Sequence, residues 1–172
     1  MGTKRNYYLV GPMGSGKSTV GKQLATALGY DFYDSDKEIE QSTGVSISLI
    51  FELEGEEGFR KRERNMITEL CSRENVVLAT GGGSILDPDN RKALTDNGFV
   101  IYLQASINQI LKRTRRDSGR PLLQTEDPRA SLNELMEVRA PLYESIADLV
   151  FNTDSHTVPE VAHKLLRDLK KP

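Results

Sequence analysis

Residues 11–18 read Gly-Pro-Met-Gly-Ser-Gly-Lys-Ser, which matches the phosphate-binding loop pattern G-x-x-x-x-G-K-S/T. An apolar run, residues 7–10, precedes this loop, and apolar residues follow it at four-residue spacing, as on one face of a helix. Strand, loop and helix in this order are the context that the motif requires. We expect the helix to end near Gly29, where glycine can take the left-handed conformation of a helix terminus.

The loop predicts a site for the phosphates of a nucleotide. Its glycines let backbone N–H groups surround phosphate oxygens at the positive end of a helix dipole. Lys17 is placed to reach the β and γ phosphates, Ser18 to bind Mg²⁺, and Thr19 to reach a more distal phosphate. A glycine-rich turn without a ligand is the alternative, and the flanking strand and helix argue against it. The residues expected to contact ATP here are Gly14, Ser15, Gly16, Lys17, Ser18 and Thr19.

Short apolar runs rich in β-branched and aromatic residues alternate with longer stretches of helical spacing along the chain. This alternation predicts the α/β class, with a parallel sheet and crossover helices. Pro159 and the four-residue apolar spacing after it predict a closing amphipathic helix. The expected strands are residues 7–10, 31–33, 76–80, 99–103 and 149–151.

Size and composition narrow the class of protein. The chain has 172 residues, so we expect a single domain over 1–172. Its net charge of -2 favours neither a nucleic acid nor a membrane as partner. The first apolar run is too short for a signal peptide or a membrane span, which predicts a cytoplasmic protein. Cys71 is the only cysteine, and we interpret it as an ordinary helix residue.

Two carboxylates follow the second predicted strand, in Asp34-Ser35-Asp36. Ligands of open parallel sheets bind beyond the carboxyl ends of the strands. If the segment stays extended, both carboxylates lie on one side. One can then act on magnesium through water while the other accepts a hydroxyl proton. Asp36 as the N-cap of the next helix is an equally good interpretation.

Three adjacent glycines, residues 81–83, follow the third predicted strand. Because glycine costs backbone entropy, we expect either an unusual conformation or a close approach of the main chain to a ligand, with a structural turn as the alternative. A familiar nucleotide hydrolase has an acidic magnesium ligand at the end of this strand, whereas this chain has Thr80. Asp34 is therefore the better candidate for magnesium.

Basic residues supply candidate anion contacts. Residues 59–64 form a charge run that is typical of a solvated helix face, but Arg60 and Glu63 share one side, so the glutamate can hold the guanidinium in one rotamer. Residues 112–120 favour a flap that brings an arginine to the transferring phosphate; an RNA-binding strip is the alternative, although no aromatic residues interleave. Arg139, from its neighbours alone, reads as a surface residue.

His156 and His163 are too far apart to form a helical metal pair, and we expect His163 on the solvent side of the last helix. His156 follows the last predicted strand and can therefore contact the nucleotide, although a plain loop role is nearly as good an interpretation.

Several of these motifs, in this order, resemble those of bacterial shikimate kinases along essentially the whole chain. The resemblance implies a three-layer α/β/α P-loop kinase fold with a five-stranded parallel sheet in the order 2-3-1-4-5. It also implies a substrate-binding region at about residues 34–64 and a lid at about residues 112–127. The motifs that carry the resemblance are Gly11 to Thr19, Asp34-Ser35-Asp36, Phe59-Arg60, Gly81-Gly82-Gly83, Arg120-Pro121-Leu122-Leu123 and Arg139-Ala140-Pro141-Leu142-Tyr143.

The activity implied by the resemblance is transfer of the γ-phosphate of ATP to the 3-hydroxyl of shikimate, giving shikimate 3-phosphate and ADP on the route to chorismate and aromatic amino acids. Mg²⁺ is the implied cofactor, and a cytoplasmic monomer without nucleic-acid or membrane partners is the expectation. Asp36 is implied as the base, Lys17 and Arg120 as catalytic contacts to ATP, and His156 as an ATP contact by position only. The implied shikimate contacts are Asp36, Arg60, Gly82 and Arg139, and the implied metal contacts are Ser18 and, through water, Asp34.

Three other functions stay open at this point. The phosphate loop alone does not choose the acceptor, so a kinase for another small hydroxy acid or for a nucleotide is possible on the same fold. A nucleotide-sensing module without catalysis and an RNA-binding protein are the other two.

Overall fold

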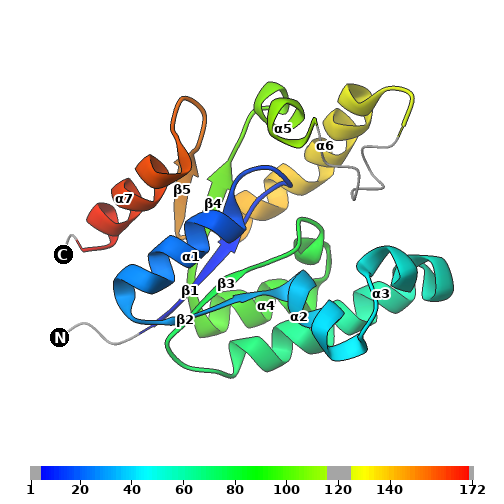
Figure 1. The fold of residues 1–172 in the computed structure, drawn as a ribbon, viewed down its shortest axis with the longest axis horizontal. Helices are drawn as coiled ribbons and strands as arrows, with labels where there is room; N and C mark the ends of the chain where they lie inside the picture. Colours follow the sequence, from blue (N-terminus) through cyan, green and yellow to red (C-terminus); the bar gives the residue numbers. More distant parts are fainter. Residues whose placement is uncertain (1–4, 116–124, 171–172) are drawn as a thin grey trace.

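The computed structural model describes residues 5–115 and 125–170, which form a parallel sheet between two layers of helices (Figure 1). The order of the strands is β2-β3-β1-β4-β5, with every neighbouring pair parallel. Both the class and the strand order confirm the prediction, and the strand ends differ from the predicted ones by no more than one residue. The strands are β1 (Asn6–Val10), β2 (Asp31–Asp34), β3 (Val76–Ala79), β4 (Gly98–Gln104) and β5 (Leu149–Asn152).

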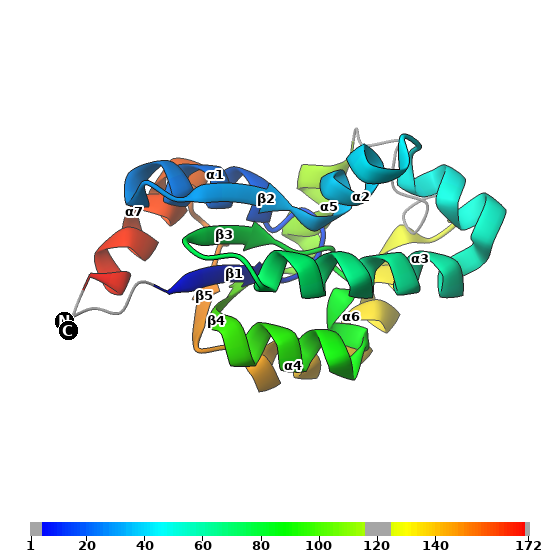
Figure 2. The ribbon, with the colours of Figure 1, turned by 90° about the horizontal axis from the view of Figure 1, so that it is seen from below.

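Helices cover both faces of the sheet (Figure 2). One face carries α1 (Lys17–Leu28) and α7 (Val158–Leu169). The other carries α3 (Ile47–Cys71), α4 (Pro88–Asn97) and α6 (Pro128–Ile146). The remaining elements are α2 (Ser35–Thr43), α5 (Ile107–Thr114) and the short 3-10 helix η1 (Ser84–Leu86).

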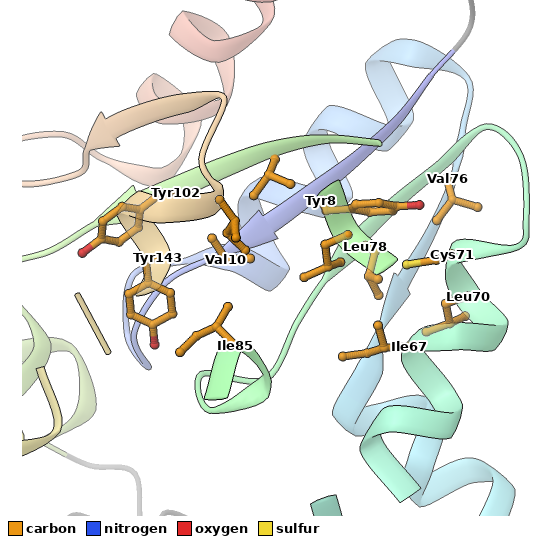
Figure 3. Packing of buried hydrophobic residues seen from close by; sticks show 13 residues of the cluster. Tyr8, Val10, Ile67, Leu70, Cys71, Val76, Leu78, Ile85, Tyr102 and Tyr143 are labelled. Carbon is orange, nitrogen blue, oxygen red and sulfur yellow. The ribbon is translucent and has the colours of Figure 1, made fainter. Parts of the chain in front are cut away.

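The buried side chains of the strands alternate between two apolar clusters, one on each face. In β1, Tyr8 and Val10 join the cluster under α3, α4 and α6, whereas Leu9 packs against α1 and α7. The first cluster extends from Tyr8 at one end to Tyr102 and Tyr143 at the other (Figure 3). Because successive side chains of a strand point to opposite faces, a strand buried on both faces reads as a continuous apolar run.

Local signals set the helix ends. Gly29 takes the left-handed conformation predicted for it, with φ 71°, and ends α1. Thr157 and Glu160 form a reciprocal capping box at the start of α7, with Pro159 in the first turn as predicted. Residues 47–71 are interrupted at Gly55, where φ is 74° and ψ is -178°, so α3 is two helical segments joined at a bend.

The topology brings the loops after all five strands to one edge of the sheet. The charged stretch 34–64 begins at the end of β2 and forms α2 and most of α3. The basic stretch 112–127 begins in the last turn of α5, and residues 116–124 of it lie outside the described part of the chain.

Candidate active site

The phosphate loop connects β1 to α1 as its motif predicts. Gly14 and Gly16 have φ 75° and 92°, values that side-chain-bearing residues rarely adopt, and the loop turns there. Gly16 is also the N-cap residue of α1, and no side chain caps this helix. The amide groups of the first turn, with the helix dipole behind them, thus form an anion site.

Lys17 lies across this loop. Its ammonium group donates to the carbonyl oxygens of Gly11 at 2.7 Å and Pro12 at 2.9 Å. The backbone therefore holds the charge within the curve of the loop, where the phosphates of a nucleotide are expected. Thr19, one residue beyond Ser18, is exposed in the first turn of α1.

Ser18 and Asp34 meet between α1 and β2. The Ser18 hydroxyl donates to Oδ2 of Asp34 at 2.5 Å. The other carboxylate oxygen, Oδ1, accepts from the backbone N–H groups of Asp36 and Lys37, so Asp34 is the N-cap of α2. A hydroxyl and a carboxylate are the oxygen donors that Mg²⁺ favours beside phosphates, and the pair fits such an ion.

The helix start at Ser35 corrects two expectations. The segment 34–36 does not stay extended, and the N-cap is Asp34 rather than Asp36. An N-cap at Asp34 lets a carboxylate satisfy two amide groups at once, and it leaves Asp36 in the first helical turn, free of the capping role. The two carboxylates thus have different surroundings although only Ser35 separates them.

Three predicted site residues crowd the run of glycines 81–83. A β-carbon at Gly81 would lie 2.8 Å from Oδ1 of Asp36, and one at Gly82 would lie 3.4 Å from Nη1 of Arg139. At Gly83 it would collide with the guanidinium of Arg60. None of the three glycines takes a positive φ. Close approach of Asp36 and Arg60 therefore leaves no room for a β-carbon at Gly81 and Gly83 in this arrangement, whereas one at Gly82 would make an ordinary contact.

The same run lies against the phosphate loop. A β-carbon at Gly82 would be 3.7 Å from the carbonyl oxygen of Gly11 and from the amide nitrogen of Met13. The carboxylate and the two guanidinium groups around residues 81–83 thus face a place next to the expected phosphates.

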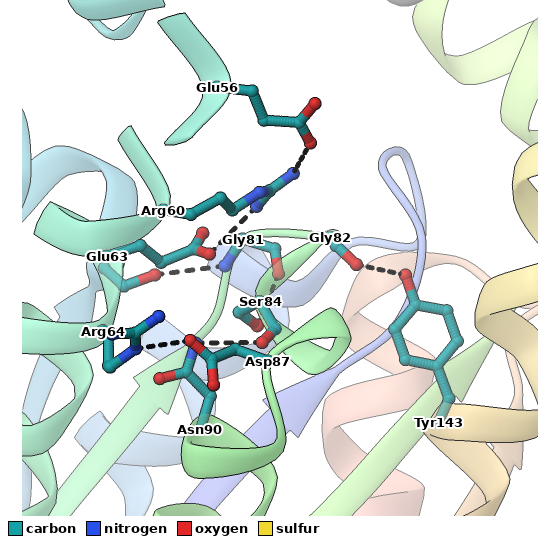
Figure 4. A network of polar contacts seen from close by, with 11 residues as sticks. Glu56, Arg60, Glu63, Arg64, Gly81, Gly82, Ser84, Asp87, Asn90 and Tyr143 are labelled. Atoms are coloured by element: carbon teal, nitrogen blue, oxygen red, sulfur yellow. Dashed lines mark hydrogen bonds and ion pairs between the residues drawn. The ribbon is translucent and has the colours of Figure 1, made fainter. Parts of the chain in front are cut away.

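Arg60 and Glu63 form the pair that their spacing predicts. Nη1 of Arg60 donates to Oε1 of Glu63 at 2.9 Å, and Nη2 lies 3.4 Å from Oε1 of Glu56 (Figure 4). Glu63 is 1% exposed, and its second oxygen is buried without a hydrogen-bond partner among the described residues. The charge run at 59–64 is accordingly not a uniformly solvated face.

Arg139 is 6% exposed, so its interpretation as a surface residue is wrong. Its direct neighbour Val138 is 60% exposed, so the two residues point to opposite sides of α6. The Nε atom of Arg139 is buried and has no hydrogen-bond partner within the described part of the chain. A buried guanidinium with unused donors is suited to an anionic ligand.

Burial changes the acid–base properties of this cluster. It raises the pKa of Asp36 to about 6, with a further increase from the negative charge of Asp34, against opposing effects of Lys17 and Arg60. It raises the pKa of Glu63 to about 7, although Arg60 acts in the opposite direction. A carboxylate with a pKa near 6 is ionised at neutral pH and is a stronger base than an ordinary aspartate.

Two residues near the site have contacts that the sequence patterns did not predict. Tyr143, which entered the sequence analysis only as part of a motif, donates its hydroxyl to the carbonyl oxygen of Gly82 at 2.5 Å. Arg113, counted there only within a basic strip, donates to the carbonyl oxygen of Gly14 at 3.0 Å and to Thr153 at 3.1 Å. Arg113 thus joins α5 to the phosphate loop and to the end of β5.

The remaining predicted residues have different outcomes. His156 follows β5, but Nδ1 of its ring lies 3.5 Å from Glu160 and from Lys164 of α7, so its contact with ATP stays a prediction. His163 is exposed on α7 as expected. Arg120 lies outside the described residues.

A parallel sheet of this order, with a phosphate loop after its first strand and a carboxylate beside that loop, defines a P-loop kinase that uses ATP. The family model described as "Shikimate kinase" matches residues 13–170. The chain belongs to the shikimate kinase family.

Individual relatives agree with this membership. A shikimate kinase of Thioalkalivibrio sulfidiphilus is 56% identical over 94% of this chain and 85% of that protein. One of Methylococcus capsulatus is 52% identical over 99% of this chain and 96% of that protein. Among solved structures, shikimate kinase from Acinetobacter baumannii in complex with shikimate superposes with a TM-score of 0.94 at 48% identity, covering 97% of this chain and 93% of that one.

A gluconokinase from Sinorhizobium meliloti shares only the fold, with a TM-score of 0.59 at 20% identity over 96% of this chain and 91% of that one. Within residues 5–115 and 125–170, the helices are too short or too polar to cross a membrane.

Proposed function

We propose that this chain transfers the γ-phosphate of ATP to the 3-hydroxyl of shikimate, giving shikimate 3-phosphate and ADP in the pathway to aromatic amino acids. The observation that carries the proposal is the convergence of Asp36, Arg60 and Arg139 on residues 81–83, directly beside the phosphate loop. One carboxylate and two guanidinium groups suit an acceptor that has both a carboxylate and hydroxyl groups.

In the proposed reaction the chain's residues orient two anions toward each other. Arg60 and Arg139 hold the carboxylate of shikimate, and Asp36 directs the 3-hydroxyl toward the γ-phosphorus. As the bond from the hydroxyl oxygen to phosphorus forms, the bond to the bridging oxygen of ADP breaks, and the hydroxyl proton passes to Asp36. Lys17 stabilises the negative charge of the phosphates during transfer.

Magnesium is the cofactor that the donor set accommodates. Ser18 and Asp34 would hold it, Asp34 through water, at their contact between α1 and β2. Mg²⁺ bound with ATP supplies neutralisation of phosphate charge. We further propose that residues 34–64 bind the acceptor and residues 112–127 cover the nucleotide, with Arg120 as a phosphate contact, within one domain. A monomeric state and a cytoplasmic location stay predictions from the sequence.

A panel of acceptors tests the proposed function. ADP release in the presence of MgATP is measured with shikimate, gluconate and nucleoside monophosphates as separate acceptors. We expect turnover with shikimate and little with the others, because only shikimate combines a carboxylate with ring hydroxyls, the groups that two guanidinium groups and a carboxylate base suit. Turnover with gluconate or a nucleotide and none with shikimate would assign the chain a different acceptor.

A further inference from the structure

Tyr143 joins α6 to the glycine run. Its side chain is 0% exposed, and its hydroxyl donates to the carbonyl oxygen of Gly82 at 2.5 Å. The ring lies against that of Tyr102 with centroids 5.0 Å apart and planes tilted by 36°, so the phenol has little room to turn away. Figure 4 shows the phenol reaching Gly82 from the side opposite to Arg60.

Arg139 lies one helical turn before Tyr143, on the same face of α6. Both side chains are directed at Gly82, because Nη1 of Arg139 lies 3.4 Å from the place of a β-carbon on that glycine. The positive charge of Arg139 also acts on the phenol, since it lowers the pKa of Tyr143 while burial raises that pKa more strongly. One turn of α6 thus contains both the guanidinium of Arg139 and the tyrosine that contacts the glycine run 81–83.

The position of Arg139 depends on where α6 lies. Its buried Nε has no hydrogen-bond partner among the described residues, whereas its guanidinium interacts with the hydroxyl of Tyr143 one turn later on the same helix. The hydroxyl of Tyr143 sets the distance from that helix to the backbone of Gly82. A shift of about 1 Å at a site of this kind is enough to reduce binding or turnover strongly.

We propose that Tyr143 is a positioning residue for the acceptor: its hydroxyl holds Gly82 at a set distance from α6, so that Gly82 and Arg139 contact the same acceptor molecule. This inference rests on the proposed function, in which both residues contact shikimate. A buried tyrosine hydroxyl needs a partner in any protein, so a role in stability alone has to be separated from positioning.

Tyr8 offers the matched control. It is also 0% exposed and belongs to the same apolar cluster, but its hydroxyl accepts from the Asn6 side chain at 2.9 Å, near the start of β1. Both Tyr143→Phe and Tyr8→Phe remove one buried hydroxyl and leave the ring in place. Only the first removes a contact to the active site.

The experiment measures KM for shikimate, KM for ATP, ADP affinity by calorimetry and Tm for the wild type and both variants. We expect Y143F to raise the KM for shikimate about tenfold relative to Y8F. The carbonyl oxygen of Gly82 loses its hydrogen bond, and the glycine run 81–83 then moves away from α6. The KM for ATP and the affinity for ADP are expected to stay within about twofold of the wild type, because phosphate-loop contacts are untouched.

Three results would overturn the inference. Equal KM values for shikimate in Y143F and Y8F would show that the hydroxyl serves stability alone. A parallel rise in both KM values, or a Y143F variant that cannot bind ADP, would assign Tyr143 to the fold as a whole. If the wild type itself does not phosphorylate shikimate, the proposed function fails first, so the two failures are distinguishable.

Discussion

The phosphate loop is one continuous piece of chain, whereas the proposed acceptor side comes from four. Residues 11–18 contain the loop, its lysine and its serine, and we expect backbone amides to do much of the phosphate binding. The acceptor side takes Asp36 from α2, Arg60 and Glu63 from α3, residues 81–83 after β3, and Arg139 from α6. Of these side chains Glu63 and Arg139 are buried, and Asp36 and Arg60 are half-buried against the glycines.

This difference has an energetic consequence. Anion binding by backbone amides at a helix end costs little free energy of reorganisation, because the amides are already oriented toward the anion. The acceptor side instead keeps two carboxylates and two guanidinium groups in a confined space, which costs desolvation energy that only good pairing offsets. We therefore expect some substitutions on the acceptor side to raise the free energy of unfolding while they lower activity. Substitutions in the phosphate loop are expected to do this less often.

The largest predicted effect is that of Asp36→Asn, which removes the proton acceptor and keeps the shape. We expect kcat to fall by about a hundredfold or more, while affinity for MgADP stays near that of the wild type. A coupled ADP-release assay and calorimetry measure the two quantities. Asp31→Asn, on the exposed start of β2, is the control. Near-normal turnover of D36N would remove Asp36 from the chemistry.

Arg139→Lys tests the geometry of the guanidinium rather than its charge. Lysine cannot make a two-pronged contact with a carboxylate, so we expect acceptor binding to weaken by ~1 to 3 kcal/mol, seen as a higher KM for shikimate. Arg167→Lys, on the exposed side of α7, is the matched control and should behave as the wild type. An unchanged KM for shikimate in R139K would contradict the assignment of Arg139.

The pH profile tests the raised pKa of Asp36. The base acts in its ionised form, and burial raises its pKa to about 6, so activity is lost as the pH falls through that value. We expect kcat/KM for shikimate to drop about tenfold for each pH unit below 6. The residual activity of D36N should lack this slope. A wild-type profile that stays flat down to about pH 5 would show that the hydroxyl proton of the acceptor passes to a group other than Asp36.

Glu63→Gln is expected to have the smallest effect on activity. It is also the substitution for which we expect stability and activity to change in opposite directions. The folded-state pKa is raised from 4.5 to about 7, so the native state holds a proton more tightly than the unfolded chain, and stability is lost as the pH rises through this range. We expect E63Q to lose less stability over this range, with only the part due to the raised pKa of Asp36 remaining, and to exceed the wild type in unfolding free energy by on the order of 2 kcal/mol at pH 8. Its KM for shikimate should rise severalfold, because Arg60 loses a charged partner.

The control for this prediction is Glu69→Gln on the same helix. Glu69 is 59% exposed and pairs with Arg73, so its removal should leave the pH dependence of stability unchanged. Denaturant unfolding of both variants at pH 5 and pH 8 measures the difference. Equal pH dependence in E63Q and the wild type would show that Glu63 is not the group that titrates.

The fold could be predicted closely from local patterns, since the strands were placed within one residue and Gly29 and Pro159 have the expected roles. Strand order came from the family resemblance rather than from periodicity, because apolar runs say which segments are buried and not which are neighbours. Likewise, Asp34 and Asp36 could not be told apart by spacing, because the choice of N-cap depends on where the chain enters the helix.

The order of residues alone predicted the phosphate site, because a loop of eight residues with its strand and helix contains nearly all the atoms expected to bind the anion. Folding in three dimensions was needed to bury Arg139, to place the Arg60–Glu63 pair against residues 81–83, and to bring Tyr143 to Gly82. The physical reason is that these contacts join segments far apart in sequence, 61 residues for Tyr143 and Gly82, which meet at one edge of the sheet. No local pattern contains that information.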